Sequence, residues 1–173
     1  MKVAGIVGWH DSGKTTLLIA VVQELVARGH TVSTIKHAHH GFDMDRPGKD
    51  SWQHREAGAS EVMVGSAKRW ALMHELRGAT EPGLDELLAQ MSPVDIVLVE
   101  GFKSRGHDKI EVYRAGLEEP PLVHNLSGIV AFASDNSIDD IDPTVTKLDS
   151  ADTPGVADFI EHHWALTRPA RSA

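Results

Sequence analysis

A glycine-rich turn near the N-terminus constrains this chain more than any other feature. Residues 8–16 read GWHDSGKTT, in which two glycines separated by four residues are followed at once by lysine and threonine. An apolar run over 2–8 precedes the turn, and apolar residues recur at helical spacing over 17–26 after it. The run 31–37 is typical of a second strand, which completes a strand–loop–helix–strand unit. We therefore expect an α/β fold of the phosphate-loop NTPase type, with three layers and a mostly parallel central sheet flanked by helices.

The spacing of this loop suits a polyphosphate. Gly8 and Gly13 let the backbone bend so that its N–H groups face the phosphates, and the following helix points its N-terminus at the same anion. Lys14 supplies a point charge to the β- and γ-phosphates, and the Thr15 hydroxyl can ligate Mg²⁺. A chance glycine-rich turn is the alternative, which the flanking strand and helix disfavour. The loop predicts a nucleoside triphosphate and leaves the base open. The other loop residues expected to contact the nucleotide are Trp9, His10, Asp11, Ser12 and Thr16.

A second candidate side chain follows the apolar run 95–102, which reads DIVLVEGF and is typical of a buried strand. Glu100 lies at its carboxyl end, where open parallel sheets bind their ligands. There it can hold a Mg²⁺-bound water or position an attacking water, so Glu100 and Lys14 are the candidate catalytic residues. The alternative is a carboxylate that only caps a turn. Asp95 begins the same strand and is expected at the opposite edge of the sheet.

The polar stretch after the second strand reads HAHHGFDMD and contains His37, His39, His40, Asp43 and Asp45. Three interpretations remain open. The imidazoles could bind a transition metal such as zinc or nickel, although their spacing matches no common metal site. The stretch could also be a polar surface turn. The aspartates, Asp45 in particular, could instead complete the Mg²⁺ shell while the basic residues contact an anionic substrate, and we favour such a charged, mobile loop beside the γ-phosphate, in the manner of a switch segment.

The end of a late strand supplies a candidate for reading the base. The run 128–135 ends in Ser134 and Asp135. A carboxylate at this point can accept hydrogen bonds from N1 and N2 of guanine, which adenine does not offer. Asp135 or Asn136 could equally cap the local turn.

The rest of the chain predicts a single domain over 1–166 and a disordered tail over 167–173. Apolar periodicity and turn residues set the expected boundaries of the remaining elements. We expect helices over 51–57, 84–91 and 154–164, and strands over 61–65, 69–76, 109–115 and 128–135.

Composition excludes several classes of function. The net charge of −8 argues against a protein that wraps nucleic acid, which requires a basic face. The chain contains no cysteine, so disulfides and thiolate chemistry are excluded. Its longest apolar stretch, residues 17–22, is far shorter than the roughly 20 residues of a membrane-spanning helix. We therefore expect a soluble cytoplasmic protein with no membrane or nucleic-acid partner.

The combined motifs resemble one known family, the molybdopterin-guanine dinucleotide biosynthesis adaptors (MobB). The resemblance runs from GIVGWHDSGKTTL through IKHAHHGFDMDRPGKDSWQHREAGA, RWALMHEL and VEGFK to VAFASD, in the family's order over 3–135. The stretch 35–58 is far more discriminating than the phosphate loop. The loop WHDS at 9–12 departs from the small residues that the family often has there, but its side chains are expected to point outward.

The resemblance implies a GTP-binding protein that uses Mg²⁺ and is at most a slow GTPase. It also implies a homodimer that assists a molybdenum cofactor guanylyltransferase, the partner that attaches GMP to molybdopterin. The family's phosphate loop, acidic strand end and charged loop correspond here to Gly8, Gly13, Lys14, Thr15, Thr16, Glu100, Gly101, His37, His39, His40, Asp43 and Asp45. The anionic phosphate of molybdopterin is expected near one of four basic residues, namely Lys36, Lys49, Lys103 and Arg105.

Two other functions remain as alternatives. A small-molecule kinase of phosphate-loop type would need a lid with several arginines, and 69–92 holds only Arg69 and Arg77. A nickel or cobalt metallochaperone GTPase would use the histidines of the polar stretch. A slow GTPase fits a site without an obvious arginine finger; Arg46 and Arg55 are candidates for one, although nothing in the sequence places either at the γ-phosphate.

Overall fold

Two units make up the chain, and the computed structural model describes residues 1–38, 41–136 and 140–167. The first unit, which we call the sheet unit, consists of residues 1–37 and 91–173. The second, the hairpin unit, consists of residues 38–90. His39, His40 and all of the predicted tail except residue 167 lie outside the described residues.

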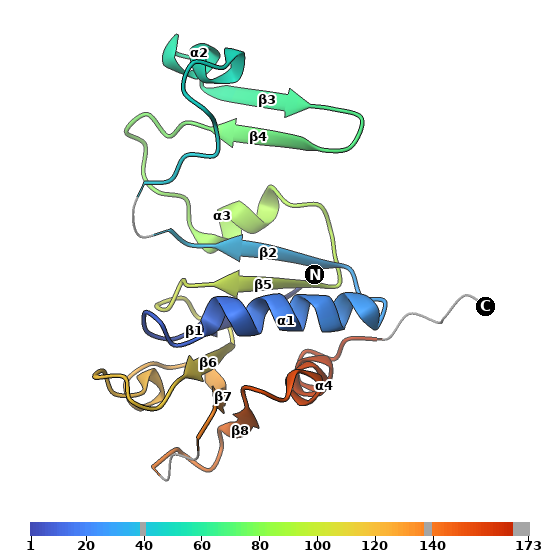
Figure 1. Ribbon diagram of the computed structural model, residues 1–173, viewed down its shortest axis with the longest axis vertical. Helices are drawn as coiled ribbons and strands as arrows, with labels where there is room; N and C mark the ends of the chain where they lie inside the picture. The colour runs from blue at the N-terminus through green and yellow to red at the C-terminus, as the bar shows by residue number, and fades with distance from the viewer. Residues whose placement is uncertain (39–40, 137–139, 168–173) are drawn as a thin grey trace, which may run out of the picture. The chain divides into compact units, whose positions relative to one another are not determined.

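Six strands form the sheet of the sheet unit, in the order β2-β5-β1-β6-β7-β8 (Figure 1). Every neighbouring pair within this sheet is parallel, so the expected mostly parallel sheet is confirmed. Because β5, β1 and β6 are neighbours that run in the same direction, their carboxyl ends lie together at one edge of the sheet. The strands are β1 (Lys2–Val7), β2 (Val32–Lys36), β5 (Ile96–Glu100), β6 (Lys109–Tyr113), β7 (Ile129–Ser134) and β8 (Thr146–Asp149).

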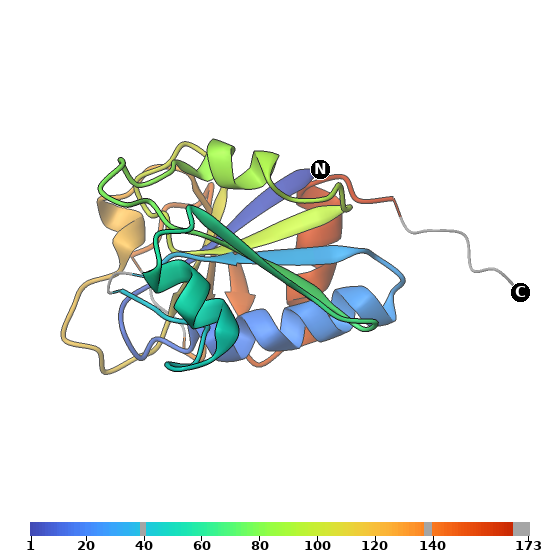
Figure 2. The ribbon, with the colours of Figure 1, turned by 90° about the horizontal axis from the view of Figure 1, so that it is seen from above.

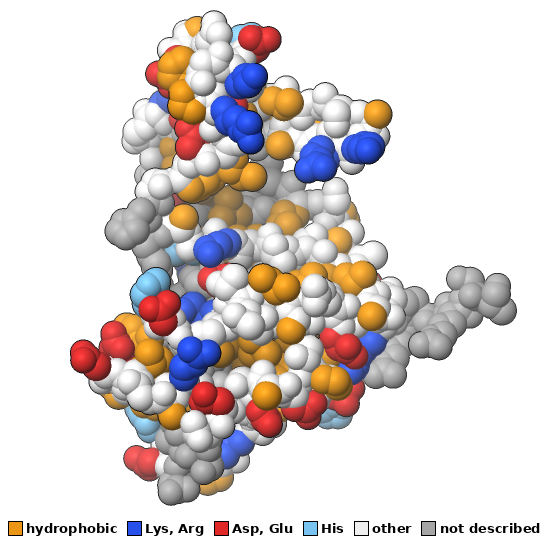
Figure 3. Space-filling model, in the orientation of Figure 1, with side chains coloured by type: hydrophobic (Ala, Val, Ile, Leu, Met, Phe, Trp, Pro, Cys, Tyr) orange, Lys and Arg blue, Asp and Glu red, His pale blue; other side chains and the backbone are white. Residues whose placement is uncertain are grey.

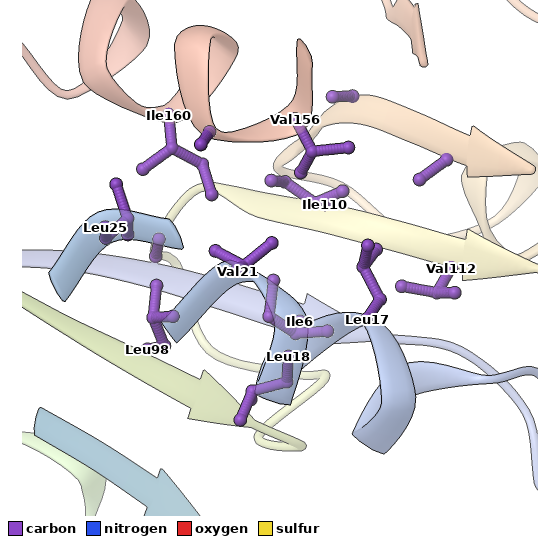
Figure 4. Close-up of a cluster of buried hydrophobic side chains, with 14 of the residues drawn as sticks. Ile6, Leu17, Leu18, Val21, Leu25, Leu98, Ile110, Val112, Val156 and Ile160 are labelled. Carbon is purple, nitrogen blue, oxygen red and sulfur yellow. The ribbon is translucent and has the colours of Figure 1, made fainter. Parts of the chain in front are cut away.

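Two helices, α1 (Lys14–Ala27) and α4 (Thr153–His163), pack against each other and cover one face of this sheet (Figures 1 and 2). Their apolar side chains meet those of the strands in a single core (Figure 4). Its fully buried members include Val21 and Leu25 from α1 and Ile160 from α4. The helical spacing of these residues in the sequence is what directs them to one face.

The C-terminal end of α1 is fastened to α4 by charged groups. The Arg28 guanidinium donates to the carboxylates of Glu24 at 2.8 Å, Asp158 at 2.5 Å and Glu161 at 2.8 Å. The other carboxylate oxygen of Glu161 lies 2.8 Å from His30 Nε2, which is buried. These contacts fix the two helices against each other at the end far from the glycine-rich loop.

The opposite face of β6 and β7 carries a second, smaller apolar cluster built on Tyr113, Phe132 and Ile141. Beside it, the side chain of Glu111 is fully buried in β6. Its carboxylate accepts the N–H groups of Leu122 at 2.6 Å and Val123 at 2.8 Å, in the short 3₁₀ helix η1 (Leu122–His124). Burial raises the pKa of Glu111, while these two hydrogen bonds oppose the rise.

The hairpin unit contains α2 (Asp50–Glu56), the strands β3 (Glu61–Gly65) and β4 (Trp70–His74), and α3 (Leu84–Ala89). β3 and β4 pair antiparallel in a sheet of their own. No helix separates these two strands in the sequence, so a short turn joins them and antiparallel pairing follows. Arg77 closes the unit by donating to the carbonyl oxygens of Arg55 and Ala59.

The predicted helices and strands are all present, with ends that differ by a few residues. The edge strand β8 and the 3₁₀ helix η1 were not predicted. β8 is short and mostly exposed, so its sequence lacks the apolar run or alternation that announces a strand. Among the described residues, none of the helices combines the length and the apolar character needed to cross a membrane.

Candidate functional site

The glycine-rich loop connects β1 to α1 at the carboxyl edge of the sheet. Gly8 has a φ of 152°, and a Cβ there would lie 2.3 Å from the Val112 carbonyl oxygen of β6. Any larger residue would therefore collide with the neighbouring strand. Gly13 precedes α1 in the left-handed region, with a φ of 91°. The chain thus turns from strand to helix at the two positions that the sequence marks.

Lys14 is the first residue of α1, and its ammonium donates to the carbonyl oxygen of Trp9 inside the same loop. Partial burial lowers the pKa of Lys14 below its usual value, while the Glu100 carboxylate opposes this shift. The lysine side chain therefore lies folded back over the loop in which it is expected to contact the phosphates. Thr16, the last loop residue predicted to bind, is exposed in the first turn of the helix.

Thr15 and Glu100 come together across the sheet edge. The Thr15 hydroxyl donates to Glu100 Oε1 at 3.1 Å, although the two residues are far apart in the sequence. Glu100 is opposite Ile6 of β1 and Lys36 of β2 in the strand register, and the Lys36 ammonium lies 3.5 Å from Glu100 Oε1. A hydroxyl and a carboxylate oxygen are hard ligands of the kind that Mg²⁺ prefers, so this pair fits the predicted ion.

The chain turns sharply after Glu100. Gly101 has a φ of 99°, and a Cβ there would lie 2.8 Å from the Cβ of His37. Phe102 also has a positive φ, 51°, and its ring lies against that of His37 with centroids 4.5 Å apart. His37, predicted as a nucleotide contact, therefore packs beside the turn that carries Glu100.

The loop's own side chains divide into two groups. His10 and Asp11 are almost fully exposed and lie 3.5 Å apart, as expected for side chains that point outward. Ser12 instead turns inward and is 3% exposed, which corrects the expectation for the loop interior. Space for it exists because Gly8 has no side chain, since a Cβ on Gly8 would approach Ser12 Oγ to 2.6 Å.

Trp9 does not point freely outward either. Its indole Nε1 donates to the Pro120 carbonyl oxygen at 2.8 Å, and the Lys103 ammonium lies 4.2 Å from the centroid of its ring. The sequence predicts Lys103 only as one of the residues near the phosphate of molybdopterin, and it does not predict this contact with the phosphate loop. No local pattern could have revealed it, because the two residues are brought together only by the turn that follows β5.

The predicted base-reading residues lie at the end of β7, two strands from β1. Ser134 is buried, and its hydroxyl accepts the Asn136 N–H at 3.3 Å. Asp135 is exposed, and its Oδ1 accepts the Ala115 N–H and the Asn136 side-chain amide, each at 3.3 Å. The carboxylate thus takes part in the local turn at the carboxyl edge where it was expected.

Asp43 and Asp45 belong to the hairpin unit. The two carboxylate oxygens of Asp43 accept the Arg55 guanidinium at 2.9 and 2.7 Å, which lowers the pKa of Asp43 to about 2. Asp45 Oδ1 accepts the Ser51 hydroxyl at 3.0 Å and the Arg46 N–H at 2.8 Å. Both aspartates therefore organise their own unit. His39 and His40, predicted beside them, fall outside the described residues.

Within the described part of the chain, no group of three or more histidine, aspartate or glutamate side chains is arranged to hold a metal ion by itself. On the face seen in Figure 3, acidic and basic side chains are interspersed.

Residues 3–135 match the protein family described as molybdopterin guanine dinucleotide synthesis protein B. Two similar proteins, from Haemophilus influenzae and Escherichia coli, are both described as molybdopterin-guanine dinucleotide biosynthesis adapter proteins. The first is 41% identical over 166 residues, covering 92% of this chain and 89% of that protein. The second is 43% identical over 156 residues, covering 88% of this chain and 87% of that protein.

A solved structure has the same fold. The crystal structure of a MobB protein homologue from Bacillus stearothermophilus superposes with a TM-score of 0.73 at 24% identity, covering 96% of this chain and 100% of that one. The expected phosphate-loop NTPase-type architecture is thereby confirmed.

Proposed function

Since the chain belongs to the molybdopterin guanine dinucleotide synthesis protein B family, we propose that it is a GTP-binding adaptor. In this role it assists a guanylyltransferase that converts molybdopterin to molybdopterin-guanine dinucleotide. The relatives from Haemophilus influenzae and Escherichia coli are described as adapters of this biosynthesis, which supports the assignment.

One observation carries the nucleotide part of this proposal. The glycine-rich backbone, the Lys14 ammonium and the Thr15–Glu100 pair, with its 3.1 Å hydrogen bond, all occur at one edge of a parallel sheet. In this arrangement loop N–H groups and Lys14 bind the β- and γ-phosphates of GTP. Thr15 and Glu100 would hold Mg²⁺, which when bound offsets the negative charge of the phosphates.

Hydrolysis is secondary in this proposal. An arginine that reaches the γ-phosphate is worth about 10³–10⁵ in rate. Arg55, one of the two candidates, places its guanidinium against Asp43 at 2.7 Å and Glu75 at 3.6 Å within the hairpin unit. This engagement supports a slow GTPase whose main work is to present bound GTP or a GTP-dependent surface to its partner.

Nucleotide binding is tested by calorimetric titration of GTP in the presence of Mg²⁺. Lys14→Ala removes a partly buried charge contact worth a few kcal/mol, so GTP affinity should fall about tenfold or more. Lys2→Ala is the matched control, because Lys2 begins β1 at the far edge of the same sheet and is exposed. Unchanged affinity in Lys14→Ala would refute the phosphate-loop assignment.

The guanine preference is tested at Asp135. We propose that its carboxylate accepts hydrogen bonds from the N1–H and N2–H groups of guanine. Asp135→Asn should reduce the preference for GTP over ATP in competition titrations, because an amide presents a donor where guanine also donates. A variant that still prefers GTP by the original margin would place base recognition elsewhere.

The adaptor role is tested with the purified guanylyltransferase and molybdopterin. Adding this chain with GTP should increase the yield of the dinucleotide, and Lys14→Ala should remove the increase. Equal yields with and without the chain would contradict the adaptor role. They would favour the kinase or metallochaperone alternative instead.

We also propose a homodimer, as the family resemblance implies. Large apolar side chains are exposed on β3 and β4, and such surfaces mark contacts with other chains. They are Met63 (64% exposed), Val64 (47%), Trp70 (65%) and Leu72 (42%). Sedimentation equilibrium should give twice the chain mass of 18.8 kDa, and a monomer at all concentrations would contradict this.

A further inference from the structure

Two lysines from different parts of the sheet unit contact the same loop residue. The Lys14 ammonium donates to the carbonyl oxygen of Trp9, and the Lys103 ammonium lies 4.2 Å from the centroid of the Trp9 ring. Trp9 is itself held in place, because its indole N–H donates to the Pro120 carbonyl oxygen at 2.8 Å. A bulky residue at the first position after Gly8 thus connects the phosphate loop to a second cation.

Lys103 is placed by a constrained turn. Gly101 and Phe102 both have positive φ angles, 99° and 51°, which turn the chain back toward the end of β1 directly after Glu100. The Gly101 N–H donates to the Ile6 carbonyl oxygen at 3.2 Å, and Phe102 is 8% exposed. Lys103 therefore leaves a turn that is anchored to β1, the strand that leads into the phosphate loop.

The segment that begins at Gly101 is also anchored at its other end, at Lys109. Lys109 begins β6 and is fully buried, and its ammonium donates to the Arg105 and His107 carbonyl oxygens at 2.6 and 2.7 Å. A buried ammonium that binds several carbonyl oxygens draws the backbone of residues 105–107 around itself. Both ends of the segment from Gly101 to Lys109 are consequently tied to the sheet.

The charge of Lys103 is only partly balanced. Within residues 1–38, 41–136 and 140–167, its ammonium lies against the Trp9 ring, and the carboxylates of Glu111 and Glu119 attract it without forming an ion pair. Burial lowers the pKa of Lys103, and Lys103 in turn helps to lower the pKa of Lys14. Two partly desolvated ammonium groups that repel each other would both be stabilised by a polyanion between them.

We propose that Lys103 is a second phosphate-binding lysine of the nucleotide site, held beside Lys14 by the ring of Trp9 to contact the β- and γ-phosphates of GTP. This role presupposes the GTP binding proposed above. The cation–π contact keeps Lys103 near the loop before the nucleotide arrives. A charge-assisted hydrogen bond to phosphate is stronger, so the ammonium moves from the ring to the anion at little cost.

The test compares nucleotide affinities of Lys103→Met and Lys103→Arg by calorimetry with GTP, GDP and GMP. Lys103→Met keeps a long side chain against Trp9 but removes the charge, and it should weaken GTP and GDP binding about tenfold or more. GMP binding should change much less. Lys103→Arg should retain most of the affinity, because the charge is kept. Lys2→Met, at the opposite edge of the sheet, should match the wild type.

A second variant approaches the same contact from the other side. Trp9→Leu leaves Lys103 in the chain but removes the ring that holds its ammonium, so GTP affinity should fall by a smaller factor than in Lys103→Met. The far-ultraviolet circular dichroism and urea unfolding midpoint of each variant establish that the fold is intact.

Several outcomes would overturn the inference. If Lys103→Met bound GTP with wild-type affinity, Lys103 would not bind the nucleotide. It would then be a candidate only for the phosphate of another ligand. An equal loss for GMP would exclude the β- and γ-phosphates, and a Lys103→Arg variant as weak as Lys103→Met would indicate a packing role. Failure of this inference is distinguishable from failure of the proposed function, since the latter requires that the wild type itself bind no GTP or that Lys14→Ala bind it normally.

Discussion

The buried carboxylate of Glu111 tests how the segment that contains Pro120 and the helix η1, beside the phosphate loop, is held in place. Glu111→Gln keeps the size of the side chain but replaces one acceptor oxygen with an amide nitrogen. In the wild type, the two carboxylate oxygens accept the N–H groups of Leu122 at 2.6 Å and Val123 at 2.8 Å. The variant can satisfy only one of them, and its amide nitrogen would face the other N–H group.

The expected cost follows from these contacts. A hydrogen bond to a charged group is worth about 1.5–3 kcal/mol, and a buried donor left without a partner costs about 1–3 kcal/mol. Burial of the carboxylate charge opposes the stabilisation that these hydrogen bonds give, since the pKa of Glu111 is raised rather than lowered. We therefore expect Glu111→Gln to reduce the free energy of unfolding by about 1–3 kcal/mol near pH 4.5, and by less at pH 7.

The pH dependence has a definite sign. Because the pKa of Glu111 is higher in the folded protein than its usual value of 4.5, the folded state holds this proton more tightly than the unfolded state does. The stabilisation that arises from this difference is complete below pH 4.5 and is lost as the pH rises through the folded pKa. The deficit of Glu111→Gln relative to wild type should accordingly be largest near pH 4.5 and shrink toward neutral pH.

Urea unfolding followed by tryptophan fluorescence, at a series of pH values from 4.5 to 8, measures this difference. Glu118→Gln is the matched control, because Glu118 is exposed in the same connecting segment. Equal m-values would establish that the change in midpoint reflects stability. A deficit that grows with pH, or no deficit at any pH, would refute the assignment of Glu111 as the buried anchor of this segment.

Three further outcomes are expected. Gly101→Ala should lower the free energy of unfolding by about 1–3 kcal/mol, because φ is 99° and the new Cβ would lie 2.8 Å from His37 Cβ; wild-type urea stability would contradict this. Leu25→Ala empties a fully buried core position and should cost about 2–5 kcal/mol in thermal or urea unfolding, whereas a loss below about 1 kcal/mol would indicate that the core collapses into the gap. Asp43 should titrate near pH 2 by NMR, and Arg55→Met should return its pKa toward 3.8; since the folded pKa is depressed, the stability contributed by the pair is present above pH 3.8 and is lost as the pH falls through about 2.

Much of the fold follows from local sequence pattern. The helix predicted over 51–57 is observed at Asp50–Glu56, and the buried strand predicted over 95–102 at Ile96–Glu100. Apolar spacing and turn residues determine such elements because each reflects the burial of one face. The edge strand Thr146–Asp149 escaped prediction because its mostly exposed side chains follow no such pattern.

The candidate site was predictable to a lesser extent. The glycines, Lys14 and Thr15 are adjacent in the chain, so their spacing alone describes the loop that they form. Glu100 could be placed at the correct edge because parallel strands end together. Its hydrogen bond to Thr15 and its approach to Lys36 depend on the strand order, which the sequence does not state.

Sequence pattern is enough to identify the phosphate-loop unit, the parallel α/β class and the membership in a family of cofactor-synthesis adapters, because these depend on residues that are near neighbours or occur in a fixed order. Three features depend instead on how the chain packs: Trp9 contacts both Lys103 and Pro120, Ser12 turns inward, and Glu111 holds the helix η1. These contacts join segments separated by many residues. Their partners are selected by the packing of the whole sheet unit, and no local spacing records that selection.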